Sequence, residues 1–569
     1  MLSLKKSVLK VENLSVHYKT DSDQVLAVES VSFSLEEGSC LGIIGESGSG
    51  KTSAAMAIMG LLSKKAEISG QVCYYDRELD GLSEQEWQQY RWKKIAMVFQ
   101  NGLDVLNPVL TVQEQIYECL RRHTKLSKQE AKDRVAGLLE MTGLDPDWGK
   151  NYPHQLSGGM RQRVLIAMAL SCDPEVLLVD EPTSALDAVA KDEIITLLAK
   201  LNKERRLAML VVSHEIPVIM KLTSKVAVMY AGHIVEEGIT KDVIKNPQHP
   251  YTRGLLYSAP SLNPYRDLWG IPGETGVSKK EQCCFYGRCN QKLELCRTKA
   301  PLLEYVWVER KVACNQGGIV TLLQGQGICK NYEFKGETVK ACANCEIKIR
   351  SGEIVALIGE SGSGKTTLAS ILAGISLADE GEVRFLGDRV QGNNFTSRIK
   401  GIQMVFQDPF SAVNEHLTVG QAVREPLDIL RLGSKEERRM AVLKALQDVQ
   451  LPRDELFLDR RCHRLSGGQR QRVAIARSLV MEPKLLIADE ISSMLDSSTQ
   501  ANVLRLLKGL QNSLGFSMLY VTHDLALARK IADRVYVMQK GRIIEHGTIA
   551  DVFSSPKEKY TCKLVQMMI

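Results

Sequence analysis

Two glycine-rich segments of the chain end in a lysine and a threonine, a combination that can hold a phosphate group. The first is Gly45-Glu46-Ser47-Gly48-Ser49-Gly50-Lys51-Thr52, and the same residue types recur at residues 359–366. Glycines at these spacings let the backbone turn tightly, so that consecutive N–H groups and the start of a helix face the anion. The lysines would reach the β- and γ-phosphates of a nucleotide, and the threonine hydroxyls would ligate magnesium. The predicted nucleotide contacts are Gly45, Ser47, Gly48, Gly50, Lys51, Thr52 and Ser53, and Gly359, Ser361, Gly362, Gly364, Lys365, Thr366 and Thr367.

Downstream of each glycine-rich segment, an apolar strand-like run ends in an aspartate followed by a glutamate. The pairs are Asp180-Glu181 and Asp489-Glu490. The first carboxylate at a strand end can hold magnesium through its water shell, and the second can accept a proton from an attacking water. Such a pair is common by itself, but its place after a phosphate loop makes it specific. We therefore predict that the aspartates hold magnesium and that the glutamates are general bases.

A histidine ends the next strand-like run of both copies. These residues are His214, after Val211-Val212-Ser213, and His523, after Val521-Thr522. A lone histidine at a strand end more often has a structural role, but the repetition at the same place favours a contact with the γ-phosphate. We predict that contact for both histidines.

The repeated motifs indicate that the chain is a tandem duplication. In each copy, an apolar run ends at the glycine-rich loop and a helical pattern follows, and further strand-like runs alternate with helices. This alternation predicts an α/β fold with a mostly parallel sheet and ligand chemistry at the carboxyl ends of the strands. We expect domains at residues 1–260 and 319–569, with a small Cys-rich insert and linker at residues 261–318. The pairs that keep one constant spacing are Ser157/Ser466, Asp180/Asp489, His214/His523, Pro247/Pro556 and Tyr251/Tyr560.

Length and composition are those of a globular protein with several domains. The 569 residues exceed the size at which one core usually keeps growing. The net charge of +6 is spread along the chain without a basic tail, so no nucleic-acid partner is expected. The longest apolar runs are far shorter than the ~18 to 20 residues of a membrane helix. Residues 1–10 contain no apolar segment typical of a secretory signal, so we expect a cytosolic chain that does not itself span a membrane.

A third repeated segment resembles the signature of the ATP-binding cassette (ABC) family. It reads Leu156-Ser157-Gly158-Gly159-Met160 in the first copy and Leu465-Ser466-Gly467-Gly468-Gln469 in the second. A serine and two glycines that open a helix make another anion-binding terminus, and no phosphate remains for it within its own cassette. The resemblance implies an intramolecular dimer of cassettes packed head to tail. Its two ATP sites would pair Lys51 with Ser466, and Lys365 with Ser157.

The resemblance covers both copies nearly end to end and implies further site residues. Tyr18 and Tyr332 look like the aromatic residues that stack on adenine. Gln100 and Gln407 look like the Q-loop glutamines, which contact magnesium and lie near docked membrane subunits. Residues 184–187 and 493–496 look like D-loops. The implied architecture is two P-loop NTPase domains of the RecA-like, ABC type, each with a helical signature subdomain. The signature residues implied to contact nucleotide are Ser157, Gly158, Gly159, Ser466, Gly467, Gly468 and Gln469.

Three positions depart from the family pattern. Met160 replaces the signature glutamine, Ile491-Ser492 replaces the usual proline and threonine, and Met494 replaces the D-loop alanine. None of these changes removes a reacting group. We therefore expect two sites that hydrolyse ATP, and the departures leave open whether the two sites have equal rates.

Four cysteines of the insert, Cys283, Cys289, Cys296 and Cys314, have spacings that could hold a metal. Five of the 14 cysteines of the chain lie between residues 283 and 314. Soft thiolates in a cytosolic segment suit an iron–sulfur cluster or zinc, and ordinary free cysteines are the remaining alternative. The segment resembles the C-terminal extension of ATPase subunits in the dipeptide, oligopeptide and nickel importer family, which implies a 4Fe-4S cluster first and zinc second. Cys284 could replace Cys283 as a ligand.

Residues 249–256 carry the same resemblance. It implies an ATPase peripheral to the cytoplasmic face of the plasma (inner) membrane, working with two transmembrane permease subunits and an extracytoplasmic solute-binding protein. The solute would be a peptide, nickel or a metal chelate, or a glutathione-like compound, and peptides are the first expectation. The alternatives are a tandem cassette protein that acts on ribosomes or nucleic acid, and the ATPase of an exporter.

Overall fold

The computed structural model describes residues 7–19, 24–63, 65–100, 105–262, 270–274, 281–334, 337–390, 401–408, 413–491 and 496–567. The chain divides into two compact units, which are described separately. The first unit comprises residues 1–262, 273–287 and 293–318, and the second comprises residues 263–272, 288–292 and 319–569. Among the residues so described, no helix is long and apolar enough to cross a membrane.

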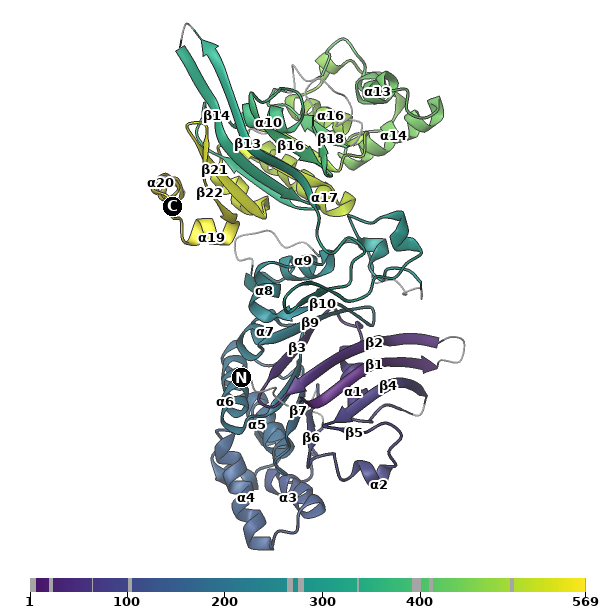
Figure 1. Ribbon diagram of the computed structural model, residues 1–569, viewed down its shortest axis with the longest axis vertical. Helices are drawn as coiled ribbons and strands as arrows, with labels where there is room; N and C mark the ends of the chain where they lie inside the picture. Colours follow the sequence, from purple (N-terminus) through teal and green to yellow (C-terminus); the bar gives the residue numbers. More distant parts are fainter. Residues whose placement is uncertain are drawn as a thin grey trace. The chain divides into compact units, whose positions relative to one another are not determined.

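The core sheet of the first unit has the strand order β11-β12-β10-β9-β3-β8-β7-β6. Figure 1 labels β3, β6, β7, β9 and β10 of this sheet. The five strands from β9 to β6 run parallel, and β10, β12 and β11 continue the sheet antiparallel. Strands β3, β7 and β8 are buried along their whole length, as expected for parallel strands covered on both faces. The predicted mostly parallel sheet is confirmed. The bounds are β3 (Cys40–Ile44), β6 (Ile95–Val98), β7 (Val176–Asp180), β8 (Ala208–Val212), β9 (Lys225–Tyr230), β10 (His233–Ile239), β11 (Glu304–Trp307) and β12 (Arg310–Val312).

A second, antiparallel sheet of the first unit has the order β2-β1-β4-β5. Helix α1 (Lys51–Ile58) packs between the two sheets, because Ala54 and Ile58 share one hydrophobic core with Val11 of β1 and Leu210 of β8. This packing fixes the helix whose first turn follows the phosphate loop. The strand bounds are β1 (Ser7–Lys19), β2 (Gln24–Glu36), β4 (Ala66–Tyr74) and β5 (Arg77–Glu78).

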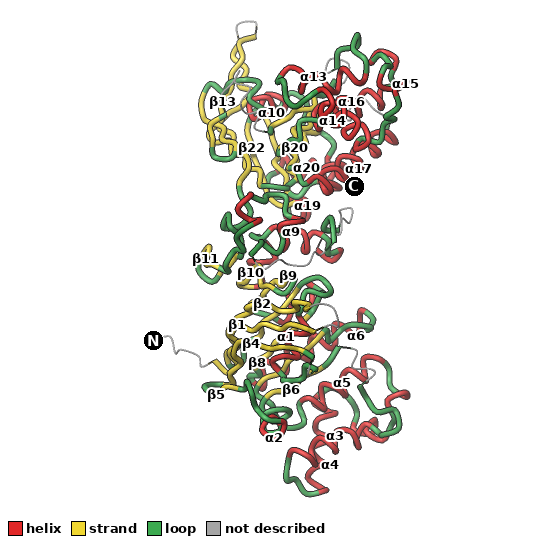
Figure 2. The backbone as a smooth tube through the Cα atoms, turned by 90° about the vertical axis from the view of Figure 1, so that its right-hand side faces the viewer, coloured by secondary structure: helices red, strands yellow, loops and turns green. Residues whose placement is uncertain are grey.

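The remaining helices of the first unit include a helical subdomain formed by α3, α4 and α5, which lies apart from β1 and β2 (Figure 2). Thr111 and Ser127 start α3 and α4 with capping boxes, in which the cap serine or threonine and a glutamate three residues later satisfy the first free N–H groups. The predicted helical subdomain is therefore present. The bounds are α2 (Glu84–Trp87), α3 (Val112–His123), α4 (Lys128–Met141), α5 (Gly158–Ala169), α6 (Ala188–Arg205), α7 (Ile216–Leu222), α8 (Thr240–Lys245) and α9 (Pro250–Tyr257).

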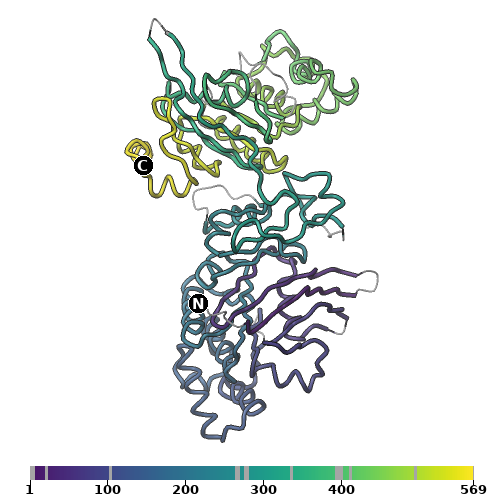
Figure 3. The backbone as a smooth tube through the Cα atoms, in the orientation of Figure 1, coloured from purple at the N-terminus to yellow at the C-terminus, as the bar shows by residue number. Residues whose placement is uncertain are grey.

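The second unit repeats this plan. Its core sheet has the order β18-β19-β20-β15-β21-β22, and its antiparallel sheet the order β14-β13-β16-β17. Figure 3 shows that segments distant in sequence meet in this unit, because β14 (teal) lies beside β22 (yellow). The strand bounds are β13 (Thr321–Phe334), β14 (Glu337–Arg350), β15 (Ile354–Ile358), β16 (Glu380–Phe385), β17 (Asp388–Arg389), β18 (Ile402–Val405), β19 (Leu485–Asp489), β20 (Ser517–Thr522), β21 (Arg534–Gln539) and β22 (Arg542–Thr548).

The helices of the second unit also include a helical subdomain, here built from α13, α14 and α16. The bounds are α10 (Lys365–Leu372), α13 (Val419–Ile429), α14 (Lys435–Asp448), α15 (Glu455–Leu458), α16 (Gly467–Leu479), α17 (Ser497–Leu514), α18 (Leu525–Ile531), α19 (Ile549–Ser554) and α20 (Lys559–Gln566).

Part of the predicted insert adds two strands to the core sheet of the first unit. Strand β12 pairs with β10, where Glu236 lies opposite Val312. The carboxylate of Glu236 is fully buried and accepts hydrogen bonds from Nη2 of Arg310 at 2.6 Å and from its Nε at 3.0 Å. A buried carboxylate needs such a partner, so Arg310 holds the insert against β10.

Candidate functional site

The phosphate loops begin directly after β3 and β15, at the carboxyl ends of central parallel strands. Gly48 and Gly50 have φ angles of +78° and +98°, in the left-handed region that favours glycine. A Cβ atom on Gly50 would lie 2.0 Å from the carbonyl oxygen of Ala27, whereas one on Gly48 would meet nothing within 4 Å. The second loop has the same geometry at Gly362 and Gly364. The loop is therefore packed on one side and open on the other, where a phosphate can enter.

The two phosphate-loop lysines are held by carbonyl groups of their own loops. Lys51 Nζ donates to the carbonyl oxygens of Gly45 and Glu46 at 3.0 and 2.9 Å. Lys365 Nζ makes the same two contacts, both at 2.9 Å, with Gly359 and Glu360. Burial lowers the pKa of both ammonium groups, and nearby carboxylates oppose this effect. Each lysine therefore already lies at the phosphate loop, where a bound phosphate would be.

The two aspartates at the ends of β7 and β19 are almost completely buried. Among the described residues, neither oxygen of Asp180 receives a hydrogen bond of normal geometry. Thr366 Oγ1 donates to Asp489 Oδ1 at 3.3 Å. Burial raises the pKa of Asp180, and it raises the pKa of Asp489 to about 6. A buried carboxylate with at most one hydroxyl donor fits a hard cation that prefers oxygen ligands, so these residues suit Mg²⁺.

The structure brings a glutamine and a histidine to each predicted general base. Gln100 Nε2 donates to Glu181 Oε2 at 2.9 Å, and His214 Nδ1 lies 2.8 Å from Glu181 Oε1. In the second unit, Gln407 Nε2 donates to Glu490 Oε2 at 2.9 Å. Six predicted side chains, a glutamate, a glutamine and a histidine from each unit, therefore gather into two clusters. Their proximity was not predicted from the sequence, which gave each of them a separate role.

The second cluster is arranged differently in detail. His523 Nδ1 lies 3.5 Å from Glu490 Oε1, and Lys365 Nζ lies 3.7 Å from the same oxygen. Both glutamates adopt left-handed backbone conformations, with φ of +47° at Glu181 and +44° at Glu490. Such conformations are costly for residues other than glycine and are found at functional sites held by their surroundings. Hydrogen bonds from the glutamate N–H groups to the neighbouring strand hold them here, at 2.8 and 3.0 Å.

The two signature segments each start a helix, as predicted. Ser157 caps α5 by accepting a hydrogen bond from the N–H of Met160 at 3.3 Å. Ser466 caps α16 in the same way, and Oε1 of Gln469 also accepts from the N–H of Ser466 at 3.2 Å. Methionine cannot make this second bond, so the departure at Met160 removes half of a capping box. The pairing of each signature serine with the opposite phosphate loop stays a prediction.

The predicted adenine-stacking tyrosines lie at corresponding places on β1 and β13. Tyr18 Oη donates to Ser53 Oγ at 3.3 Å, which links it to α1. Tyr332 is 45% exposed, and Lys330 Nζ lies 5.7 Å from the centroid of its ring. Tyr18 is partly buried beside Ser53, which follows the first phosphate loop, and Tyr332 is exposed. Stacking on adenine stays a prediction for both.

The D-loop of the first unit is tied to the general base. Ser184 Oγ donates to the carbonyl oxygen of Glu181 at 3.0 Å, and Asp187 caps α6. Thr183 Oγ1 donates to Glu215, which also pairs with Lys191 at 2.8 Å. Residues 492–495, which include the departures Ser492 and Met494, lie outside the described residues. Asp496 caps α17 through the N–H of Thr499.

Comparison with known proteins assigns the family. A model described as "ABC transporter" matches residues 28–184 and 342–493, more than half of the chain. The chain belongs to the ABC transporter family. A second model, "Oligopeptide/dipeptide transporter, C-terminal region", matches residues 235–296 of this ABC ATPase, from β10 into the insert. Its two cassettes are fused in one chain, and ATP hydrolysis is its activity.

Two curated relatives are similar to the ABC ATPase over nearly its whole length. The oligopeptide transport ATP-binding protein OppD of Mycobacterium tuberculosis is 34% identical over 600 residues, covering 98% of both chains. The glutathione import ATP-binding protein GsiA of Escherichia coli K12 is 36% identical over 575 residues, covering 98% of this chain and 89% of the relative. Neither similarity favours a ribosome-associated protein or an exporter.

In the part of the insert that the structure describes, the cysteines of the ABC ATPase form no group that could hold a metal ion. Cys283, Cys296 and Cys314 belong to the first unit and Cys289 to the second. Within the part of the chain that the structure describes, no group of three or more His, Cys, Asp or Glu side chains could hold a metal ion. A hydrogen bond with the Cys284 thiol lowers the pKa of Cys283 to about 7, and burial raises the pKa of Cys314. The predicted 4Fe-4S cluster or zinc ion is not supported, and no chemistry is assigned to it.

Two further tyrosines touch the phosphate loops and were not predicted as site residues. Tyr251 Oη accepts a hydrogen bond from the N–H of Glu46, and Tyr560 Oη accepts one from the N–H of Glu360. The sequence does show that the two tyrosines recur at the constant spacing of the two copies. It does not show that they contact the phosphate loops, because the contacting residues are 205 and 200 positions apart in the chain.

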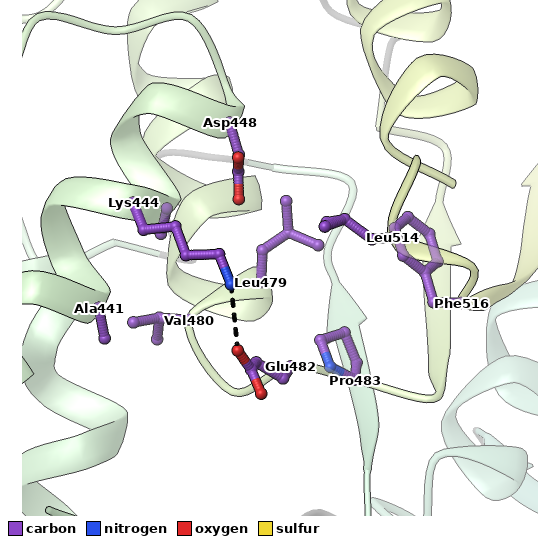
Figure 4. Close-up of a pocket in the computed structure, with 10 residues that line it drawn as sticks. Ala441, Lys444, Asp448, Leu479, Val480, Glu482, Pro483, Leu514 and Phe516 are labelled. Atoms are coloured by element: carbon purple, nitrogen blue, oxygen red, sulfur yellow. Dashed lines mark hydrogen bonds and ion pairs between the residues drawn. The ribbon is translucent and has the colours of Figure 1, made fainter. Parts of the chain in front are cut away.

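A cavity of about 280 Å³ in the second unit lies outside the ATP-binding machinery. It is bordered by α14, the end of α16 and the residues before β20, and Lys444 and Glu482 bridge it with a 3.3 Å ion pair (Figure 4). Its described lining contains no residue that was predicted to bind nucleotide. The ATP site is therefore defined by the motifs and not by this cavity.

Proposed function

We propose that this ABC ATPase is the motor of an importer for oligopeptides or a related small solute. The main support for this proposal is the similarity, over almost the whole chain, to ATP-binding proteins of oligopeptide and glutathione import. The match of residues 235–296 to the C-terminal region of oligopeptide and dipeptide transporters adds support. Nickel or a metal chelate is the second candidate solute.

We further propose that the protein lies on the cytoplasmic face of the plasma membrane. There it docks on two permease subunits, and an extracytoplasmic binding protein delivers the solute to them. Gln100 and Gln407 could transmit the docking of a permease to the ATP site, since each contacts the general base of its own unit. A shift of either glutamine would change the environment of the reacting carboxylate.

In the proposed mechanism, Glu181 and Glu490 accept a proton from the water that attacks the γ-phosphate. Their oxygens already accept hydrogen bonds from glutamines, which orient them. Lys51 and Lys365 exchange loop carbonyls for phosphate oxygens when ATP enters. Magnesium, when bound, would neutralise the charge of the phosphates. Asp180 with Thr52, and Asp489 with Thr366, would hold it, together with the two glutamines.

Co-purification and reconstitution test the importer assignment. We expect the affinity-purified chain to carry two hydrophobic permease subunits. In liposomes, that complex together with its binding protein should take up a labelled oligopeptide only when ATP is present on the side of this chain. Recovery of ribosomal particles in place of permeases, with ATPase activity stimulated by ribosomes, would contradict the assignment.

The binding protein itself identifies the solute. Mass spectrometry of the ligand that it retains after purification should detect a peptide of a few residues. A retained nickel ion or metal chelate would replace the peptide assignment with the second candidate.

A further inference from the structure

Each unit brings a tyrosine from a helix that follows the core sheet to the start of its phosphate loop. The N–H of Glu46 donates to Oη of Tyr251 on α9 at 2.8 Å. The N–H of Glu360 donates to Oη of Tyr560 on α20 at 3.1 Å. The contact occurs twice, at equivalent positions of two copies that differ in most of their residues. Its recurrence indicates a role tied to the loop.

The tyrosines bind the same peptide group that holds the phosphate-loop lysine. The carbonyl oxygen of Gly45 belongs to the peptide whose N–H is that of Glu46, and it accepts from Lys51 Nζ at 3.0 Å. In the second unit, the carbonyl oxygen of Gly359 accepts from Lys365 Nζ at 2.9 Å. One peptide group thus connects each tyrosine to each lysine. A peptide that donates through its N–H is also a stronger acceptor through its C=O, so the two bonds reinforce each other.

We propose that Tyr251 and Tyr560 are positioning residues of the two ATP sites. Each hydroxyl fixes the orientation of the first peptide of the loop, and this holds the lysine and the following N–H groups in place before the phosphates arrive. Neither tyrosine takes part in the chemical step. Loss of the hydroxyl weakens ATP binding, because the loop must then be ordered at the expense of binding energy.

The surroundings of the two tyrosines differ. Tyr251 is fully buried, with the ring of Tyr230 at 4.5 Å and that of Phe285 at 5.7 Å between centroids. His249 Nδ1 accepts from the N–H of Tyr251 at 3.2 Å. Phe285 belongs to the insert and follows Cys283 and Cys284. The insert therefore packs directly on the residue that positions the first phosphate loop.

In the second unit, the residues that correspond to Tyr230 and His249 are not aromatic. Gln539 stands at the place of Tyr230, and Glu558 stands at the place of His249. Tyr560 is only partly buried against its core. The proposal therefore assigns the insert an influence on the first ATP site and not on the second.

Removal of each hydroxyl from the full-length chain tests the positioning role. Tyr251→Phe is measured in a Lys365→Ala background, and Tyr560→Phe in a Lys51→Ala background, so that one site is observed at a time. We expect the Kd and the KM for Mg·ATP to rise about three- to tenfold, the loss typical of one hydrogen bond, with kcat changed less than twofold. A fall in kcat at unchanged KM would overturn the proposal.

Tyr536→Phe is the matched control. Its hydroxyl accepts a backbone N–H at the same 3.1 Å distance as that of Tyr560, but from Lys348 and not from the phosphate loop. Tyr536 is likewise part of the second unit and is buried. We expect this variant to keep the KM for ATP. Equal losses of ATP affinity in Tyr536→Phe and Tyr560→Phe would show a general effect on folding and overturn the positioning role.

Phe285→Leu tests the influence of the insert. It should raise the KM for ATP about twofold or more in the Lys365→Ala background and leave it unchanged in the Lys51→Ala background. Equal changes in both backgrounds, or no change in either, would overturn the link between the insert and the first site. Thermal unfolding of each variant checks that the fold is retained.

Discussion

Both units place a glutamine and a histidine at the general base, yet the contacts around that base differ between the units: in the second unit Lys365 Nζ also lies 3.7 Å from Glu490 Oε1. The glutamine contact is the same in both, at 2.9 Å, whereas the histidine lies at 2.8 Å from Glu181 and 3.5 Å from Glu490. The first unit carries the buried pair of Glu236 and Arg310, while the second keeps the complete capping box at its signature helix. The two ATP sites therefore differ although their reacting side chains are the same, because the residues that contact these side chains differ between the units.

The largest expected effect comes from removal of both general bases. Glu181→Gln with Glu490→Gln should lower ATP hydrolysis about 10²- to 10⁴-fold, which corresponds to roughly 3 to 5.5 kcal/mol of barrier. The protein should then retain unhydrolysed nucleotide. Steady-state phosphate release and analysis of the bound nucleotide measure both results. The single variants would separate the two units, and we expect unequal residual rates. Undiminished hydrolysis in the double variant would refute the assignment.

The buried ion pair of the first unit gives the second prediction. Arg310→Ala leaves the carboxylate of Glu236 buried without its partner, so the first unit should lose about 3 to 5 kcal/mol of stability. Calorimetry of the full chain should show one transition lowered by roughly 10 °C while the other stays in place.

Glu545 of the second unit is the control for that pair. It accepts the N–H groups of Lys557 and Glu558, as Glu236 accepts those of Gln248 and His249, but it is less buried. Glu545→Gln should lower stability by less than about 1 kcal/mol, since one amide oxygen still accepts a hydrogen bond. An equal loss of stability in Arg310→Ala and Glu545→Gln would show that the deeper burial of Glu236 does not make its contacts more important than those of Glu545.

The buried aspartate of the second unit gives the third prediction. Burial holds the folded-state pKa of Asp489 at about 6, above the ordinary aspartate value of 3.8, so its charged form costs stability at higher pH. Asp489→Asn should therefore stabilise the nucleotide-free protein at pH 7.5 by up to about 3 kcal/mol. The gain should shrink as the pH falls through 6, where the carboxyl group becomes protonated and neutral. Denaturant unfolding at pH 7.5 and 5.5 measures the difference.

The same variant should respond less to magnesium than the parent protein. Mg·ATP should raise the melting temperature of the parent protein more than that of Asp489→Asn, because the amide is a poorer ligand than the carboxylate. A variant that gains no stability at pH 7.5, yet still responds fully to Mg·ATP, would contradict both parts of the prediction.

The smallest expected effect concerns the signature helices. Met160→Gln should complete the capping box of α5 and stabilise it by about 0.5 to 1 kcal/mol. Gln469→Met should remove the corresponding bond of α16 and cost a similar amount. Thermal unfolding and the ATPase rates of each site measure these changes. If the capping difference contributes to unequal turnover, Met160→Gln should bring the two rates closer together.

Much of the fold was predictable because its signals are local. The apolar runs of β7 and β19, each of which ends in an aspartate, indicated buried parallel strands, and the structure confirms them. The serine and glycines of both signatures predicted helix starts, and Ser157 and Ser466 are helix caps. The prediction of a metal centre is not supported, because among the described residues no group of cysteine side chains could hold a metal ion. The insert instead uses β12 to extend a sheet, through a pairing that the spacing of cysteines does not specify.

The sequence by itself determined the duplication, the two phosphate loops, the acidic pairs and the helix starts, since each depends on a few neighbouring residues. Only the tertiary structure placed Gln100 and His214 on Glu181, gave that glutamate a left-handed backbone, and brought Tyr251 to the loop 205 residues before it. These contacts arise where parallel strands end side by side at one edge of a sheet. Their partners are distant along the chain, so no local pattern encodes them, and strand order and packing decide which side chains meet.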